Sequence, residues 1–181
     1  MCSKLTLVLV GTGVGICGSI TVQWLAHRWE DRWRKRAIAG ALAGEIAAIC
    51  AIARRRRYLE TTQLLLKRVR ECQQPGWMVV KITYDYMTIY QSNASAIGLL
   101  PPQSALDVVT FYTQIRALME DVSADGPAPA TVDEAEELLK GQIELLDETL
   151  QLGDRVAQDL RKLASGGIRL KRAEKLGGNK P

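Results

Sequence analysis

The chain is poor in the residues that build metal, redox and hydrolytic sites. It contains one histidine, His27, and four cysteines in 181 residues: Cys2, Cys17, Cys50 and Cys72. No two cysteines stand at the spacing of zinc ligands or of a redox motif. The sequence also has no nucleophile elbow, Walker loop or zinc-protease helix. We therefore predict a protein without metal or cofactor that is not an enzyme, with its cysteines serving as small apolar residues in a reducing compartment.

Charge is almost absent from the first 26 residues, where Lys4 is the one charged side chain. Residues 5–26 form a run of 22 residues without a charge. As a helix, this run would be about 33 Å long, which matches the ~30 Å hydrocarbon core of a bilayer. We predict a flank at residues 1–4 and a transmembrane helix at residues 5–26.

Aromatic and basic residues follow this run directly. Indole rings favour the headgroup region, and cations near a span mark its cytoplasmic side. The sequence therefore predicts a single-pass protein of the inner (plasma) membrane, with its N-terminus outside and its C-terminus in the cytoplasm. The residues expected at the membrane interface are Trp24, Arg28, Trp29, Arg32, Trp33, Arg34, Lys35 and Arg36.

Two other interpretations of the first segment fit less well. A cleaved signal peptide would need a small-x-small exit, and this segment ends in Trp, Leu and His. Gly13, Gly15 and Gly18 spell the G-x-G-x-x-G of a dinucleotide-binding fold. That motif requires a second strand ending in an acid about 20 residues later, and residues 33–40 contain neither.

Small residues recur along one face of the expected span, at Gly11, Gly15 and Ser19. Such a stripe allows two membrane helices to approach closely. Both a homodimer through this face and the ordinary abundance of small residues in membrane spans account for it.

The chain beyond the span has the periodicity of helices. Residues 28–72 contain no proline and are expected to form one helix continuous with the span. Within it, residues 37–53 could form a second span, but they number only 17, contain Glu45 and have basic flanks on both sides. Residues 77–86 could be strand or helix from their composition.

Turn and cap signals divide the rest of the chain. They predict helices at about 84–97, 102–123 and 131–165, with Pro102 in a first turn and Thr131 and Glu134 as a capping box. We expect an all-α fold in which residues 27–165 form a cytoplasmic antiparallel bundle, with a coiled-coil-like apolar seam in the last helix. Residues 166–181 are expected to be a basic, disordered tail.

The charges are unevenly distributed. Residues 28–71 hold twelve Lys/Arg against five Asp/Glu, whereas residues 131–159 hold nine Asp/Glu against two Lys/Arg. Arg54 to Arg57 occupy a whole helical turn, so they cannot all serve one face. A solvated surface accounts for them most simply, and anionic lipid or nucleic acid are the alternatives. No recognition module accompanies them, which argues against a nucleic-acid partner.

Glu45 is the one acid in an apolar helix. A buried acid can have a raised pKa and serve in catalysis. We instead expect a core glutamate that is hydrogen-bonded to Tyr84, Tyr86, Tyr90 or Tyr112. On that view we expect that leucine could replace Glu45 without loss of stability.

The chain resembles a group of bacterial proteins with one N-terminal span and a helical cytoplasmic region, for which no activity is established. The resemblance rests on Ala41 to Ile46, Tyr90, Asn93, residues 97–102, Ala105, Val109, Phe111 and Tyr112. It implies the same architecture over about residues 5–165 and implies no activity.

Our leading functional hypothesis is a membrane-anchored, non-catalytic helical scaffold or interaction protein. Its partners would be the lipid bilayer and a protein that the sequence does not identify. The alternative is a soluble, basic helical protein that binds nucleic acid or a nucleotide, with the first segment buried in its core. Attachment to membranes separates the two hypotheses.

Overall fold

The computed structural model describes the backbone of residues 2–81, 85–123, 126 and 128–166. Side chains are described over the same ranges, except those of residues 2–23 and 25–26. Within these ranges the chain is all-helical, which confirms the expected fold class, and no strand is present in them. The tail at residues 167–181 lies outside the described part of the chain.

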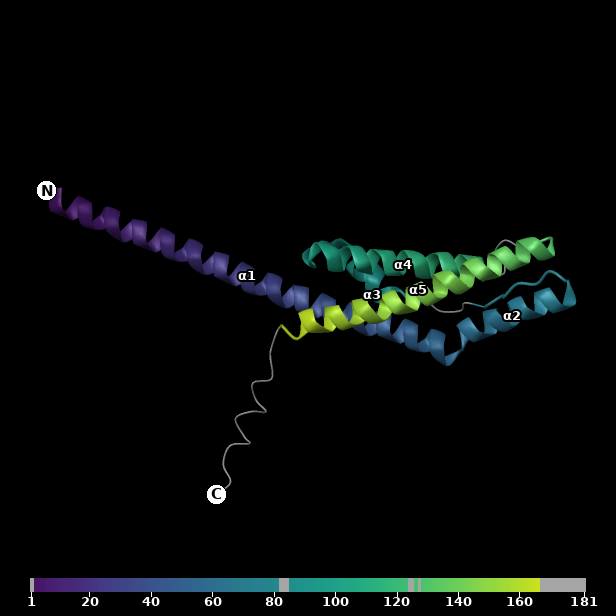
Figure 1. Cartoon of the computed structure of the whole chain (residues 1–181). Coiled ribbons are helices and arrows are strands. Elements are labelled where there is room, and N and C mark those ends of the chain that lie inside the picture. Colours follow the sequence, from purple (N-terminus) through teal and green to yellow (C-terminus); the bar gives the residue numbers. More distant parts are fainter. Residues whose placement is uncertain (1, 82–84, 124–125, 127, 167–181) are drawn as a thin grey trace, which may run out of the picture.

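Four helices pack together (Figure 1). They are α1 (Cys2–Arg55), α2 (Tyr58–Cys72), α4 (Pro102–Asp121) and α5 (Val132–Ala164). A short helix, α3 (Thr88–Asn93), and a 3-10 turn, η1 (Ala94–Leu99), connect α2 to α4. The long helix α5 contacts all three other long helices and holds the assembly together.

Helix α1 has two parts with different surroundings. Figure 1 shows its N-terminal part extending clear of the other helices. The first buried side chain is that of Ile38, and Leu42 and Ile46 follow as fully buried core residues. The packed bundle therefore begins near Ile38, and residues 27–37, which we expected inside it, form an exposed or half-exposed stalk.

The expected continuous helix at 28–72 is wrong, because the chain breaks after Arg55. Arg57 adopts a left-handed conformation, with φ 56° and ψ 41°. Such a conformation costs a non-glycine residue about 1–2 kcal/mol. No proline or glycine near Arg57 indicates this break in the sequence. The break allows both segments to follow α5, since α1 contacts its C-terminal half and α2 its N-terminal half (Figure 1).

The residues of α1 and α2 contact those of α5 in the opposite sequence order. Ala164 lies beside Gly40, Asp154 binds Arg54, and Glu136 binds Arg70. Positions further along α1 and α2 therefore meet positions nearer the start of α5.

The segment after α2 differs from expectation. We expected helix from about residue 84, but the short helix begins only at Thr88. Residues 74–81 and 85–87 have no helix or strand, and Tyr84 lies outside the described part. One backbone hydrogen bond, from Val80 N–H to Val122 O at 2.8 Å, holds this β-branched segment against the end of α4.

The later helices agree with their local signals. Pro102 occupies the first turn of α4. The Thr131 hydroxyl accepts a hydrogen bond from Glu134 N–H at 3.2 Å, as the capping-box pattern predicts. Gly166 has φ +64° and follows the end of α5 as a left-handed cap.

The tightest point of the core lies where α1, α4 and α5 meet at Gly153. A Cβ at Gly153 would overlap with Cys50 Sγ and would lie 2.7 Å from Phe111 Cε2. Cys50 and Phe111 are both buried. Only a residue without a side chain allows these three helices to approach so closely.

Candidate functional site

The residues expected at the membrane interface lie on the stalk of α1, apart from Trp24, which lies just before it. The three tryptophans are 56%, 63% and 66% exposed, in the order Trp24, Trp29 and Trp33. Arg28, Arg32 and Arg34 are exposed as well, whereas Lys35 and Arg36 are half-buried where the bundle begins. We call these eight residues the collar. Large indole rings are rarely left in water in this number, so the exposed rings indicate a surface that another phase or molecule covers.

Seven of the eight collar residues lie within about one half of the helix circumference, and Arg34 lies on the other half. Successive residues turn by about 100°, so Trp29 and Trp33 lie about 40° apart, whereas Trp24 lies about 140° from Trp29. Arg28 and Arg34 lie about 120° apart by the same geometry. The guanidinium carbon of Arg28 lies 4.5 Å from the Trp24 ring centroid, and that of Arg36 lies 5.9 Å from the Trp33 centroid. In each cation–π pair the arginine lies three or four residues after its tryptophan, so cations and indoles lie next to each other along the helix.

The expected dimer face falls on the N-terminal part of α1. Gly11, Gly15 and Ser19 lie within the described helical backbone. Their side chains lie outside the described residues, so the homodimer stays a prediction.

One helical stretch of the described chain, within residues 27–72, is long and apolar enough by length and composition to cross a membrane. It contains the segment that we considered as a second span, residues 37–53. Ile38, Leu42 and Ile46 of that segment are buried against the other helices. Packing in the bundle core accounts for its apolar composition.

Glu45 is the most connected side chain of the core. Its carboxylate accepts hydrogen bonds from the backbone N–H groups of Ile89 and Tyr90, at 2.7 and 3.0 Å. It accepts a third from the Tyr112 hydroxyl at 2.5 Å. Ile89 and Tyr90 belong to the first turn of α3, whose N–H groups have no partner within the helix. Glu45 therefore caps α3 from a different helix.

Two tyrosines complete this cluster. The rings of Tyr90 and Tyr112 are stacked, with centroids 3.9 Å apart. Burial, followed by the bond to Glu45, raises the pKa of Tyr112. The expected Tyr112 partner is confirmed, and Tyr90 takes part through its backbone. Since the carboxylate is 8% exposed and holds three donors, its role here is to fix α3 against α1.

The arginine run divides at the helix break. Arg54 donates to both carboxylate oxygens of Asp154 on α5, through a fork at 3.0 and 2.5 Å. Arg56 instead donates to the Tyr58 hydroxyl at 2.9 Å. As their spacing predicted, the four arginines do not all lie on one surface.

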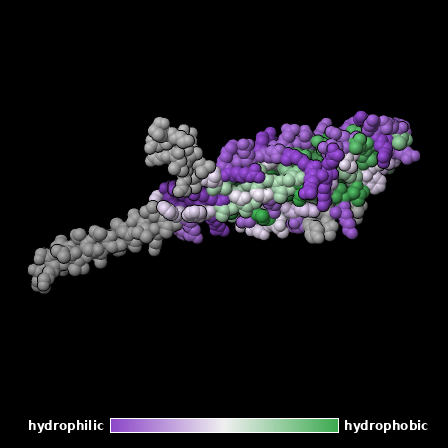
Figure 2. Space-filling view, turned by 90° about the horizontal axis from the view of Figure 1, so that it is seen from below, coloured by the Kyte–Doolittle hydropathy of each residue, from purple (hydrophilic) through white to green (hydrophobic). Residues whose placement is uncertain are grey.

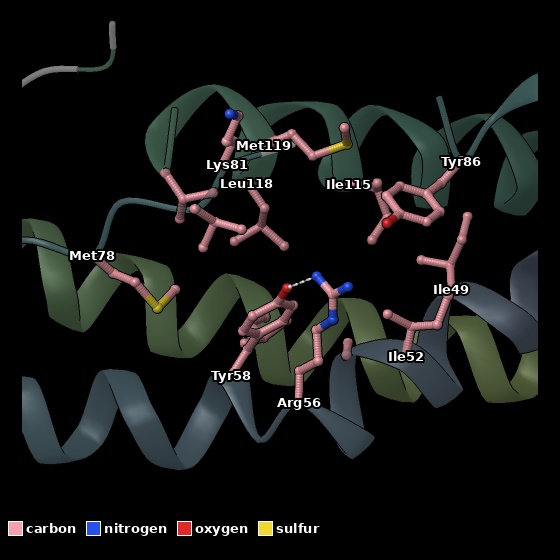
Figure 3. A pocket seen from close by; sticks show the side chains of 14 residues that line it. Ile49, Ile52, Arg56, Tyr58, Met78, Lys81, Tyr86, Ile115, Leu118 and Met119 are labelled. Carbon is pink, nitrogen blue, oxygen red and sulfur yellow. Dashed lines mark hydrogen bonds between the residues drawn. The ribbon is translucent and has the colours of Figure 1, made fainter. Parts of the chain in front are cut away.

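A small cavity, which sequence reasoning missed, lies beside Arg56. Its volume is about 130 Å³, and it lies between the end of α1, the start of α2, the segment after α2, α4 and α5. Figure 3 shows the Arg56 guanidinium directed into the space between Tyr58 and Tyr86, with apolar side chains around it. No spacing in the sequence brings these elements together, so no local signal could have revealed the cavity.

The cysteines and acids form no metal centre in the described residues, where no group of three or more His, Cys, Asp or Glu side chains converges. Burial raises the pKa of the Cys50 thiol to about 11, so this group stays protonated and unreactive at neutral pH. Cys72 is exposed.

No family model, curated protein or solved structure matches this chain. The resemblance to bacterial single-pass proteins therefore stays an expectation. Function has to be argued from the collar, the bundle and the cavity.

Proposed function

We propose that this chain is a single-pass membrane protein whose residues 5–26 cross the bilayer, with the N-terminus outside and the C-terminus in the cytoplasm. Its helices then form an antiparallel bundle that acts as a non-catalytic scaffold. The observation that carries the proposal is the collar, whose exposed tryptophans and cations lie at the end of an uncharged run of 22 residues and directly after it.

The distribution of the collar favours a helix that crosses the bilayer over one that lies on it. A helix in the plane of the interface has its indoles on one face and its cations on the other. Here Trp24 lies opposite Trp29 and Trp33, and the cations are interspersed among them. Indoles on opposite sides of the axis suit a helix that passes through the headgroup layer.

A scaffold role is supported by the position and chemistry of the bundle. From Ala26 to Ile38 the helix rises about 18 Å, so the bundle would stand clear of the headgroups. Its outer surface is mostly hydrophilic in the view of Figure 2, with apolar patches at one end. Its buried acid, Glu45, is fully used in holding α3. These features suit a domain that presents surfaces to a protein partner.

Membrane attachment tests the proposal first. The full chain should pellet with membranes, resist alkaline carbonate and require detergent for extraction. The double substitution Val10→Arg and Val14→Arg should release it, because two arginines in mid-span oppose insertion by about 5 kcal/mol or more. Ala48→Arg, on the exposed face of the same helix within the bundle, is the matched control and should stay in the membrane. A wild-type chain that remains in the supernatant would contradict the proposal.

Reporter fusions test the orientation. Alkaline phosphatase fused after Pro181 should be inactive, and green fluorescent protein at the same place should fluoresce. An active phosphatase would mean that the orientation is reversed or that a second segment crosses the membrane.

A further inference from the structure

We infer that the cavity beside Arg56 is a binding site for a small organic carboxylate with an apolar body. The inference does not depend on the membrane proposal, because the cavity lies within the bundle. It rests on three observations: the lining of the cavity, its size and the state of Arg56.

The lining is apolar apart from one edge. Aliphatic side chains from three directions, including Ile49, Ile115 and Leu118, enclose the space. The polar edge consists of Arg56, Tyr58 and Tyr86, and Lys81 lies across the space from Arg56, with its ammonium pointing away, in Figure 3. Among the described residues, no acidic side chain belongs to the lining. The site thus combines an apolar interior with a positive edge.

The size of the cavity limits the ligand. At about 130 Å³ the cavity is slightly smaller than an engineered 150 Å³ cavity that takes up benzene. The apolar body is therefore of about six carbon atoms. A lipid with full-length acyl chains is too large to enter.

Arg56 differs from its neighbour in having no ion pair among the described residues. Arg54, two residues earlier, is bound to Asp154. The Tyr58 hydroxyl accepts from the Arg56 Nη1 atom at 2.9 Å, which orients the guanidinium without neutralising it. An oriented, unneutralised guanidinium beside an apolar cavity is complementary to a carboxylate, which it can bind through two parallel hydrogen bonds.

The helix break places this group. If α1 continued past Arg55 as a straight helix, Arg56 would be an ordinary residue on the helix surface. The left-handed Arg57 instead turns the chain into α2 and leaves Arg56 at the corner, next to Tyr58.

The test uses the full chain in lipid nanodiscs of zwitterionic phosphatidylcholine, which contain no anionic lipid or free detergent. Fluorine NMR would follow the titration of para-fluorobenzoate, with para-fluorobenzyl alcohol and para-fluorobenzylamine as the neutral and cationic probes. We expect saturable binding of the carboxylate, with a Kd of about 1 mM or tighter. The alcohol should bind at least about tenfold more weakly, and the amine should show no saturation.

Two variants locate the site. Arg56→Gln should weaken carboxylate binding about tenfold or more and leave the alcohol unaffected, whereas the matched control Arg55→Gln should change it less than about twofold. Ile52→Phe, which extends a half-buried lining residue into the cavity, should weaken both probes. Circular dichroism verifies that each variant is folded. Absence of saturable carboxylate binding, equal binding of acid and alcohol, or equal loss in both arginine variants would each overturn the inference.

Discussion

The two parts of α1 have similar compositions and different surroundings. Residues 5–26 and residues 37–53 are both long, apolar and rich in small residues. The second part is buried by α4, α5 and the α3 segment, and it contains an acid whose partners come from those elements. The first part extends clear of the bundle, has no acid and ends near the exposed Trp24, with Trp29 and Trp33 exposed just beyond it. Hydropathy alone therefore does not distinguish a helix of a protein core from a helix that crosses a bilayer. The elements packed around the helix make the distinction.

The largest expected effect is a loss of core volume in the bundle part. Leu42 is fully buried, so Leu42→Ala should reduce the free energy of unfolding of the bundle by about 2–5 kcal/mol. The matched change in the first part, Leu9→Ala, should leave this value unchanged within about 0.5 kcal/mol. Urea titration in a mild detergent, followed by circular dichroism, measures both. An equal loss in the two variants would show that both parts of α1 belong to one core.

Replacing Glu45 with leucine should have opposite effects on stability in a bilayer and in the helical bundle. In a bilayer, Glu45→Leu would remove a costly charge. In the bundle it leaves two backbone N–H groups and the Tyr112 hydroxyl without acceptors, each costing about 1–3 kcal/mol. We therefore expect a loss of more than about 2 kcal/mol, which reverses the tolerance that we expected from the sequence alone.

The conservative variant Glu45→Gln, which retains an acceptor oxygen, should lose less. The comparison uses the same urea titration. A Glu45→Leu variant as stable as wild type would restore the second-span interpretation of residues 37–53.

The close approach at Gly153 gives a smaller effect. Gly153→Ala forces its Cβ against Cys50 and Phe111 and should reduce stability by about 1–3 kcal/mol. Gly141→Ala lies on the same helix with nothing within 4 Å of the new Cβ, and it should raise stability by about 0.5–1 kcal/mol. Thermal unfolding of the two variants should move the midpoint in opposite directions. A stabilised Gly153→Ala variant would mean that α1 and α5 are less tightly packed than described here.

The smallest expected effect concerns pH. In the unfolded chain the Cys50 thiol ionises near its ordinary pKa of 9.0, whereas in the folded bundle burial raises that pKa to about 11. Between these values the unfolded state loses the proton first, so the free energy of unfolding should fall as the pH rises from about 9 to 11. Urea titrations across this range should show a shallower fall for Cys50→Ala. An identical slope in the variant would contradict burial of this thiol.

Much of the helix pattern follows from the sequence, because its signals are local. The extents of α4 and α5 depend on Pro102, on the Thr131–Glu134 box and on Gly166, all within a few residues of the ends they set. The run of residues 5–26 and the collar can likewise be recognised without a fold. These features need no knowledge of what lies across the core.

Tertiary structure decided the rest, because its causes lie far apart in the chain. The break at Arg57 arises because α1 and α2 both pack on α5, about a hundred residues away. The start of α3 depends on Glu45, more than forty residues earlier, and the cavity exists because five elements meet beside Arg56. Helix propensity and periodicity contain no information on such contacts. Burial and hydrogen-bond satisfaction in the packed bundle select one arrangement from those that the sequence pattern allows.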